Sequence, residues 1–422
     1  MTTIDAHPLI STAPADLAAV AADRSGWPFA VWPDGVAVPS SVDDVRSVVA
    51  WAHATGTPVV ARGAGSGLAG ASVLSRLDRI VEIDPDEQLA RVEPGVVTAE
   101  LDARASAHGL MYAPDPGSVG ISTIGGNIAT NAGGLRGAKY GVTRDHVLAL
   151  DVVLADGTLI HVGRDTLKGV TGYDLVGLFT GSEGTLGIVV GATLRLVPRP
   201  VRTATASAAF ADLESAARAV TAITRSGARP AVLEILDGAT LAAIDALEGT
   251  SLRAAGDALL IVQTDGFGAE EELDVVVAAI AGLATAVETA TDAEASDRLL
   301  FSRRRALPAL EAIGRPLIED IAVPRARLAE AVRAIRQIAA EEGVRIFVFG
   351  HAGDGNLHPI IVTDAAPTDA PIPAAAQAAA HGVGRLKREW AVRELGPDVH
   401  ALQQRLRATL DPRGILNPGS SL

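Results

Sequence analysis

Apolar residues recur at helical spacing between residues 42 and 52. They are Val42, Val45, Val48, Val49 and Ala52. This spacing places them on one face and predicts an amphipathic helix. Ser40 or Ser41 can cap its first turn, where Asp43 and Asp44 face the positive end of the helix dipole.

Shorter segments that alternate polar and apolar residues, or concentrate β-branched ones, predict strands. The sequence predicts them at residues 58–61, 80–83, 89–92, 151–154, 158–162 and 187–196. Asp156 and Gly157 are typical of a hairpin turn between two of these strands. A further helix is expected over residues 98–108.

The pattern changes at residues 198–200, where two prolines flank an arginine. The stretch beyond is alanine-rich with helical spacing, and predicted strands interrupt it at residues 231–236 and 258–264. A strand at 346–349 and a helix at 402–410 follow. We therefore expect an α+β protein of two folding units with a boundary near residue 200.

Bulk composition indicates a globular chain of two or three domains. The 422 residues are too many for one ordinary core, and 48% are hydrophobic against 20% charged. No apolar run reaches the roughly 18 residues that a membrane-spanning helix needs, and the first ten residues lack the features of a signal peptide. We expect a soluble, cytoplasmic protein with no transmembrane segment.

Charge and cysteine content narrow the chemistry. The chain has no cysteine, which excludes disulfides, thiolate metal sites and iron–sulfur clusters. Its net charge of −14 argues against nucleic acid as a partner. Only three lysines occur, so arginine supplies most of the positive charge, and its guanidinium suits a bidentate grip on a carboxylate or phosphate.

Three glycine-rich loops carry the strongest functional signal. Residues 62–70 hold four glycines, and residues 122–134 and 180–187 combine glycine with hydroxyl and amide side chains. Glycine lets main-chain amides approach an anion closely, so the loops predict the site of a large anionic cofactor. Segment 122–134 is expected to form neither helix nor strand.

Two alternatives rest on the first loop alone. Gly65, Gly67 and Gly70 match the spacing of a nicotinamide-binding Rossmann fingerprint, although the following residues lack the helical face that this fingerprint requires. The plainer alternative is a tight surface loop without a ligand.

These loops and further motifs together make the chain resemble the FAD-binding oxidoreductases of the vanillyl-alcohol oxidase type. The resemblance is closest to the group of D-lactate dehydrogenase, the glycolate oxidase FAD subunit and D-2-hydroxyglutarate dehydrogenase, and it runs from about residue 36 to the C-terminus. The motifs lie at residues 58–70, 114–134, 139–145, 172–175, 181–187, 350–358, 381–390 and 415–419.

The resemblance implies a domain order. Residues 1–200 would form a two-subdomain PCMH-type FAD-binding domain, and residues 201–380 an α+β, ferredoxin-like cap domain for the substrate. A helical C-terminal segment, residues 381–422, would return to complete the flavin site.

The resemblance also implies FAD held without a covalent bond, since no histidine for attachment lies between Arg62 and Gly70. The implied cofactor-binding residues are Arg62, Gly63, Ala64, Gly65, Ser66, Gly67, Leu68, Pro114, Ser118, Ser122, Thr123, Gly125, Gly126, Asn127, Ala129, Thr130, Glu183, Gly184, Ile188 and Asn417.

His351 and His358 flank a glycine turn after a predicted buried strand. Such a turn can fold back and bring two imidazoles to one divalent ion, such as Zn, Mn or Fe. We predict that they bind a metal or lie at the substrate site; a structural role is the alternative.

His381 resembles the histidine that takes the hydroxyl proton in relatives, which carry a metal-binding glutamate just before it. Ala380 stands at that position here. This departure predicts weaker metal binding unless Glu389, Asp320 or Asp354 substitutes, and it puts catalytic competence in question.

Arg303 occupies the position at which relatives hold the substrate carboxylate. The alternative is that it lies on a solvent-exposed helix face.

The predicted activity is FAD-dependent oxidation of D-lactate, glycolate or D-2-hydroxyglutarate to the 2-oxo acid, by hydride transfer to flavin N5. Electrons would pass to an acceptor such as a quinone, a cytochrome or an electron-transfer flavoprotein. The alternative is a non-catalytic or weakly catalytic flavin-binding subunit of a larger oxidase complex, and a homodimer is one option for the assembly.

Overall fold

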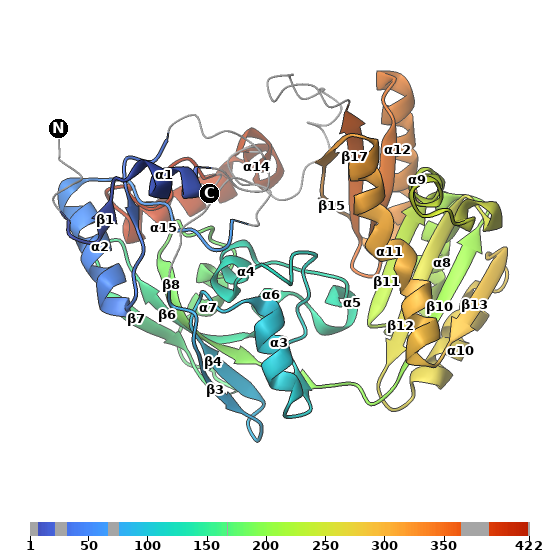
Figure 1. Ribbon diagram of the computed structural model, residues 1–422, viewed down its shortest axis with the longest axis horizontal. Coiled ribbons are helices and arrows are strands. Elements are labelled where there is room, and N and C mark those ends of the chain that lie inside the picture. Colours follow the sequence, from blue (N-terminus) through green and yellow to red (C-terminus); the bar gives the residue numbers. More distant parts are fainter. Residues whose placement is uncertain (1–6, 22–31, 66–75, 167, 364–387, 421–422) are drawn as a thin grey trace. The chain divides into compact units, whose positions relative to one another are not determined.

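The computed structural model describes residues 7–21, 32–65, 76–166, 168–363 and 388–420 (Figure 1). The chain divides into two compact units. Unit 1 contains residues 1–133, 141–199 and 382–422, and unit 2 contains residues 134–140 and 200–381. The functional names given above to residues 1–200, 201–380 and 381–422 remain predictions.

Five strands of unit 1 form one antiparallel sheet in the order β3-β4-β8-β6-β7 (Figure 1). They are β3 (Ile80–Asp84), β4 (Leu89–Val92), β8 (Ile188–Arg195), β6 (Val147–Val153) and β7 (Leu159–Gly163). A Rossmann domain is built on a mostly parallel sheet. All strand pairs in the described residues of unit 1 are antiparallel, so the Rossmann alternative is wrong.

The helices of unit 1 follow local sequence signals in part. Helix α2 (Val42–Thr55) begins after Ser41, whose hydroxyl accepts a hydrogen bond from the Asp44 amide in a capping box. This confirms the predicted helix and its cap. Strand β1 (Ile10–Ser11) pairs with β2 (Val36–Ala37), and β5 (Leu110–Met111) pairs with β9 (Val197–Pro198). The other helices are α1 (Pro14–Val20), α3 (Thr98–Ser106), α4 (Ile124–Thr130), α6 (Thr143–His146), α7 (Leu175–Phe179), α14 (Arg388–Leu395) and α15 (Pro397–Leu410).

Two predictions about local structure are wrong. The glycine-rich segment 122–134 contains helix α4, because Thr123 caps it and Ile124 and Ile128 are fully buried in the core. Tertiary packing thus overrides the poor helix propensity of Gly125 and Gly126. The predicted strand at 58–61 is reduced to one bridge, between Val59 and Leu416.

Unit 2 is built on a second antiparallel sheet. Its first four strands follow the order β13-β10-β12-β11, and two helices connect them in the sequence β10-α8-β11, β12-α10-β13. This is the ferredoxin-like arrangement. The bounds are β10 (Thr203–Phe210), α8 (Leu213–Ser226), β11 (Val232–Asp237), β12 (Ala258–Asp265), α10 (Ala269–Ile280) and β13 (Ala286–Ala290).

The sheet continues past β11 through a hairpin. Strand β16 (Ile346–His351) pairs with β11 and with β17 (Asn356–Thr363), which also pairs with β14 (Arg315–Ile318) and β15 (Ile321–Ala322). The remaining elements are α5 (Gly137–Tyr140), α9 (Gly238–Glu248), η2 (Leu252–Ala255), α11 (Ala293–Ile313), η3 (Arg325–Arg327) and α12 (Leu328–Glu342).

Helices cover both faces of this sheet. Alternate strand residues divide between two cores, so Leu260 packs with α8, α10 and α12, whereas Leu259 and Ile261 pack with α9 and α11. This alternation is the period-2 pattern of a strand buried on both faces. Together with the sheet of unit 1, it confirms the predicted α+β class.

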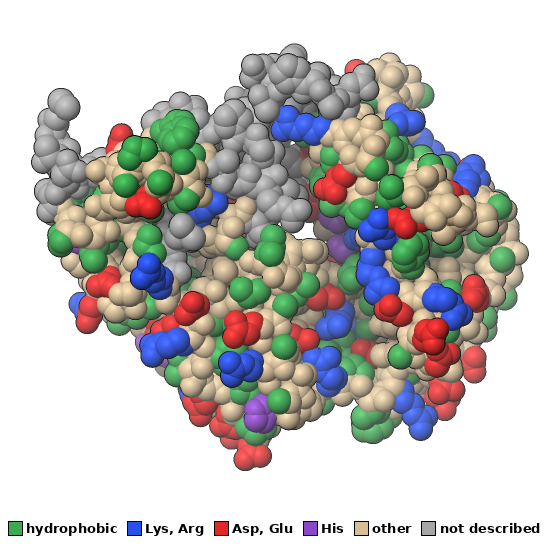
Figure 2. Space-filling model, in the orientation of Figure 1, with side chains coloured by type: hydrophobic (Ala, Val, Ile, Leu, Met, Phe, Trp, Pro, Cys, Tyr) green, Lys and Arg blue, Asp and Glu red, His purple; other side chains and the backbone are tan. Residues whose placement is uncertain are grey.

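Acidic and basic side chains are interspersed on the visible face (Figure 2). Within the described residues, no helix has the length and apolar character required to span a membrane.

Candidate functional site

The glycine-rich loops of unit 1 lie against one another. A Cβ atom added to Gly63 would lie 2.7 Å from Thr123 Oγ1, and one added to Gly184 would lie 3.8 Å from Ala61 Cβ. The Glu183 amide donates to the Ala129 carbonyl at 2.8 Å. Segments from all three predicted loops therefore meet at the N-terminal end and along one side of α4.

The C-terminal tail joins the same cluster. Val59 donates to the Ile415 carbonyl at 2.8 Å, and the Asn417 amide donates back to the Val59 carbonyl at 2.7 Å. Ile415 and Leu416 are buried with Ala52 and Ala155. Apolar burial and main-chain pairing together hold the tail beside the first loop.

Unusual backbone conformations concentrate here, which supports a ligand site. Positive φ is uncommon for residues other than glycine and marks functional sites when it clusters. The described residues include four such positions, and three of them, Asn131, Glu183 and Asn417, lie in these loops or the tail. The Gly63 main chain lies so close to the Thr123 hydroxyl that there is no room for a Cβ, and close approach of main chain is also what a diphosphate cradle requires.

Several predicted cofactor residues already use their side chains within the protein. Asn127 Nδ2 donates to Thr98 Oγ1 at 2.7 Å, and Thr98 Oγ1 lies 3.0 Å from Ser122 Oγ. These three residues are buried. Ser122 and Asn127 therefore help to fix the start of α4, and their contacts with a cofactor stay a prediction.

The remaining predicted cofactor residues lie around this core. Thr123 Oγ1 caps α4 at the Gly126 amide, Thr130 Oγ1 donates to the Gly126 carbonyl, and the Ser118 carbonyl accepts from the Ser122 amide. Arg62 donates to the Val20 carbonyl. Pro114 is buried, Gly65, Gly125 and Ile188 are half-buried, and Ala64 is exposed. Ser66, Gly67 and Leu68 lie outside the described residues.

A separate polar cluster in unit 2 centres on Glu234, which is fully buried on β11. Its Oε1 lies 2.7 Å from His351 Nδ1, and its Oε2 accepts a hydrogen bond from Arg303 Nε. Burial alone would raise the pKa of Glu234, but His351 and Arg303 hold this pKa below its usual value. Burial would likewise lower the pKa of His351, and the Glu234 carboxylate raises it instead. The cluster therefore favours an ionised carboxylate that pairs with Arg303 and accepts a hydrogen bond from Nδ1 of His351.

The hairpin β16–β17 brings the two predicted histidines together. Their ring centroids are 5.2 Å apart and the rings are nearly perpendicular. Burial, with the positive charges of His351 and Arg303, lowers the pKa of His358 to about 3, so its imidazole is neutral. The turn needs glycine, because a Cβ on Gly353 would lie 2.5 Å from Ala138 Cβ of α5.

The described residues do not form a metal centre. No group of three or more His, Asp or Glu side chains is arranged to hold an ion in the described part of the chain. Asp320 Oδ1 is 3.8 Å from His358 Nδ1. Asp354 is exposed at the turn, where its Oδ1 accepts a hydrogen bond from the Asn356 amide at 3.2 Å. His381 and Ala380 lie outside the described residues, as does the side chain of Glu389. Metal binding by His351 and His358 therefore stays a prediction.

The three consecutive arginines of α11 differ in their surroundings. The Arg303 side chain is 16% exposed and stacks over Phe349, with its Cζ 4.8 Å from the ring centroid. Arg304 is 51% exposed and pairs with Asp297. Only Arg304 thus matches the solvated helix face, whereas Arg303 is part of the Glu234 cluster.

Sequence reasoning missed Glu234. The available signal was a single acidic residue inside the apolar run Ala231–Leu236. A carboxylate in a buried strand is rare unless it is paired, so this position indicated a buried ion pair.

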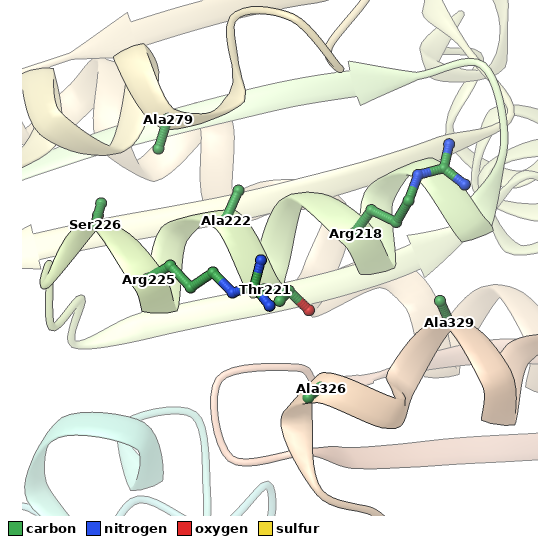
Figure 3. A pocket seen from close by; sticks show the side chains of 8 residues that line it. All are labelled: Arg218, Thr221, Ala222, Arg225, Ser226, Ala279, Ala326 and Ala329. Atoms are coloured by element: carbon green, nitrogen blue, oxygen red, sulfur yellow. The ribbon is translucent and has the colours of Figure 1, made fainter.

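A surface groove of about 550 Å³ lies elsewhere in unit 2, among α8, α10 and the start of α12 (Figure 3). Its lining is Arg218, Thr221, Ala222, Arg225, Ser226, Ala279, Ala326 and Ala329. No imidazole or carboxylate lines it, so it offers no group for acid–base chemistry. Of these two regions of unit 2, the Glu234 cluster is the one with groups suited to a reaction.

Comparisons with known proteins identify the family of both parts of the chain. Residues 33–163 match the family described as FAD binding domain, and residues 199–421 match FAD linked oxidases, C-terminal domain. The fold is similar to that of p-cresol methylhydroxylase with substrate bound, with a TM-score of 0.78 and 16% identity over 98% of this chain and 93% of that one.

Curated relatives match over nearly the whole chain. Glycolate oxidase subunit GlcD of Bacillus subtilis (strain 168) is 40% identical, covering 92% of this chain and 88% of the relative. D-lactate dehydrogenase of Archaeoglobus fulgidus is 33% identical, covering 91% and 90%. D-2-hydroxyglutarate dehydrogenase of Stutzerimonas stutzeri (strain A1501) is 31% identical, covering 93% and 91%.

Fold, loops and relatives together define an FAD-dependent oxidoreductase. The chain belongs to the FAD-linked oxidases, in the group of the D-lactate, glycolate and D-2-hydroxyglutarate dehydrogenases. The predicted family and the prediction of FAD as cofactor are thereby confirmed.

Proposed function

We propose that this protein oxidises a D-2-hydroxy acid of the D-lactate, glycolate or D-2-hydroxyglutarate class to the 2-oxo acid. The observation that carries the proposal is the buried cluster of Arg303, Glu234 and His351. A 2-hydroxy acid presents a carboxylate and a hydroxyl on adjacent carbons, so its site needs a cation and a proton acceptor. The names of the relatives support the same substrate class.

Arg303 is the proposed carboxylate anchor. Its guanidinium is held at Nε by Glu234 and on one face by Phe349, and a guanidinium has further N–H donors for a bidentate grip. Its burial excludes much of the water that would weaken this contact.

The proposed proton acceptor is a histidine, since imidazole titrates near neutral pH. His381 is the predicted base, and His351 and His358 would border the hydroxyl. Bound FAD supplies the hydride acceptor, N5 of its ring. The loops of unit 1 and Asn417 would hold this FAD without a covalent bond, because residues 62–70 contain no histidine.

No step is assigned to a metal, because the described residues offer two imidazoles without a suitably placed carboxylate. The electrons would pass from FAD to an acceptor such as a quinone, a cytochrome or an electron-transfer flavoprotein. The relatives named as dehydrogenases do not favour the alternative of a non-catalytic subunit.

Anaerobic titration of the purified holoprotein tests the proposal. D-lactate, glycolate or D-2-hydroxyglutarate should bleach the flavin absorption band, and the matching L-acids should not. Arg303→Ala should raise the half-saturating concentration by about 100-fold, as expected for a charged hydrogen-bond pair. Arg304→Ala is the matched control and should leave it unchanged. A flavin that none of the three D-acids reduces would contradict the proposed function.

A further inference from the structure

We propose that Glu234 is the positioning residue of the substrate site, with one carboxylate that orients both His351 and Arg303. This inference rests on the proposed function for its kinetic consequences. Its structural content, the orientation of the imidazole and of the guanidinium, can be measured without turnover.

Sheet register places Glu234 beside His351. Strands β11 and β16 are antiparallel, and Glu234 lies directly opposite His351 in the ladder. Directly opposed residues project from the same face of a sheet with their Cβ atoms about 5 Å apart. The pair is therefore set by the backbone of two central strands, which makes it a rigid element of the site.

The carboxylate selects one orientation of His351. An ionised carboxylate can only accept hydrogen bonds, so the 2.7 Å contact requires a hydrogen on Nδ1. The other nitrogen, Nε2, is then the one left to face a substrate hydroxyl or another ligand. Hydrogen bonds of this kind commonly fix the tautomer and ring orientation of functional histidines.

The second carboxylate oxygen orients Arg303. Oε2 accepts from Nε, and Phe349 supports the guanidinium plane from one side. In the described part of the chain, Nη1 and Nη2 of Arg303 donate no hydrogen bond to protein. Glu234 thus engages one edge of the guanidinium and leaves the Nη donors for a substrate carboxylate.

A purely structural ion pair would not need this arrangement. Replacement of a buried ion pair by apolar residues is often neutral or stabilising, so stability alone gives little reason for a fully buried Glu234. Its carboxylate contacts two residues that carry polar groups with further bonding capacity, and this is what a supporting residue of a binding site is expected to do.

The test compares Glu234→Gln and Glu234→Asp with a matched control. Glutamine keeps the size of the side chain. Its amide oxygen can accept a hydrogen bond from only one of the two neighbours, because its NH₂ group then faces the N–H of the other. Glu248→Gln is the control, since Glu248 also accepts from an arginine of α11, Arg305, at 2.6 Å but is not bonded to His351 or His358.

Two readouts are expected to change in Glu234→Gln holoprotein. The ¹⁵N NMR spectrum of the His351 imidazole should shift from a single Nδ1–H form to a mixture. The limiting rate of anaerobic flavin reduction should fall by about 10- to 100-fold, the usual effect of losing such a supporting contact. Glu234→Asp should keep the Nδ1–H form and recover part of the rate, and Glu248→Gln should match wild type in both readouts.

An unchanged imidazole spectrum in Glu234→Gln would overturn the inference, even if thermal stability fell. If glutamine prevents folding, a Glu234→Asp protein that loses the Nδ1–H form overturns it equally. The proposed function fails in a different way, because wild type would then show no flavin reduction by the D-acids while the imidazole spectra still report on Glu234.

Discussion

Asn417 donates its side-chain amide to the main-chain carbonyl of Glu183 at 2.6 Å. Both residues have positive φ, 40° and 52°, and a second contact joins Ser420 Oγ to Glu183 Oε2 at 2.5 Å. The C-terminal tail is therefore bonded to the third glycine-rich loop, more than 200 residues away in sequence.

This bond predicts that Asn417 supports FAD retention. Asn417→Ala removes the side-chain amide and its hydrogen bond. Alanine must also keep the positive φ, which its Cβ disfavours and which no side-chain hydrogen bond then supports. Together these losses cost about 1–3 kcal/mol. The FAD dissociation constant should rise by about tenfold or more, as measured by flavin fluorescence during dilution. Asn417→Gly separates the two causes, since glycine tolerates the φ value and loses only the amide. Wild-type affinity in both variants would contradict this role.

Close packing at Gly63 makes a second prediction. The Cβ of Gly63→Ala would meet Thr123 Oγ1 at 2.7 Å, so the first loop must move away from α4. We expect weaker FAD binding, by about tenfold, with the fold retained, because overpacking typically costs 1–3 kcal/mol. Gly282→Ala, where a Cβ would find nothing within 4 Å, is the control.

A double variant tests the cause. Thr123→Ala removes Oγ1, so Gly63→Ala combined with Thr123→Ala should bind FAD better than Gly63→Ala alone, after allowance for the lost α4 cap. Additive losses in the double variant would show that the two residues do not interact.

The sequence predicted the elements whose signals are local. The Ser41 cap and the apolar face from Val42 to Ala52 lie within one helix, and α2 matches them. The cofactor-loop positions were also accessible, because the spacing of glycines is visible in the sequence. Helix α4 was missed, since its stability depends on Ile124 and Ile128 meeting a core assembled from distant strands.

The Glu234 cluster could not be predicted from spacing alone. Arg303 and His351 lie 69 and 117 residues from Glu234 in the sequence, and no local pattern reports their contact. Their meeting depends on the register of β11 with β16 and on the packing of α11, which only the assembled sheet defines.

The segment 134–140 gives a third prediction, because it belongs to unit 2 and Asp265 anchors it there. Tyr140 donates its hydroxyl to Asp265 Oδ2 at 2.8 Å, and Lys139 Nζ contacts Oδ1 of the same carboxylate. Asp265→Ala removes the carboxylate that both residues contact and leaves Lys139 only the main-chain carbonyl of residue 265, at 2.9 Å. The attachment of the segment should weaken by about 3–5 kcal/mol, the cost of breaking a buried ion pair.

Hydrogen exchange measures that effect locally. The amides of residues 134–140 should exchange faster in Asp265→Ala while those of β10 remain protected. Asp257→Ala removes an exposed partner of Arg253 and should change neither, since surface pairs contribute little. Unchanged exchange in Asp265→Ala would mean that the segment is held by other contacts.

Asp237 predicts a pH dependence of stability that is opposite to the usual behaviour of a carboxylate. It caps α9 and accepts from the Thr240 and Val348 amides, yet burial raises its pKa to about 6. Between about pH 4 and pH 6 the folded state therefore holds more protons than the unfolded state, whose aspartate has a pKa near 3.9. The contribution of Asp237 to stability is largest below that window and falls as the pH rises through it, by up to about 3 kcal/mol for a shift of roughly two units.

Asp237→Asn tests this sign, because asparagine cannot ionise. The new NH₂ group faces the Val348 amide, and this costs the same free energy at every pH. The unfolding free energy of the variant minus that of wild type should therefore increase between pH 4 and pH 7. Asp212→Asn at the cap of α8 is the matched control. The hydrogen bond from the Ser215 amide lowers the pKa of Asp212, so this group titrates below about pH 4 and its difference should stay nearly flat between pH 4 and pH 7. Urea unfolding of both variants across this pH range measures these differences. If the difference for Asp237→Asn stays flat or declines with pH, the carboxyl group is ionised in the folded protein at little cost.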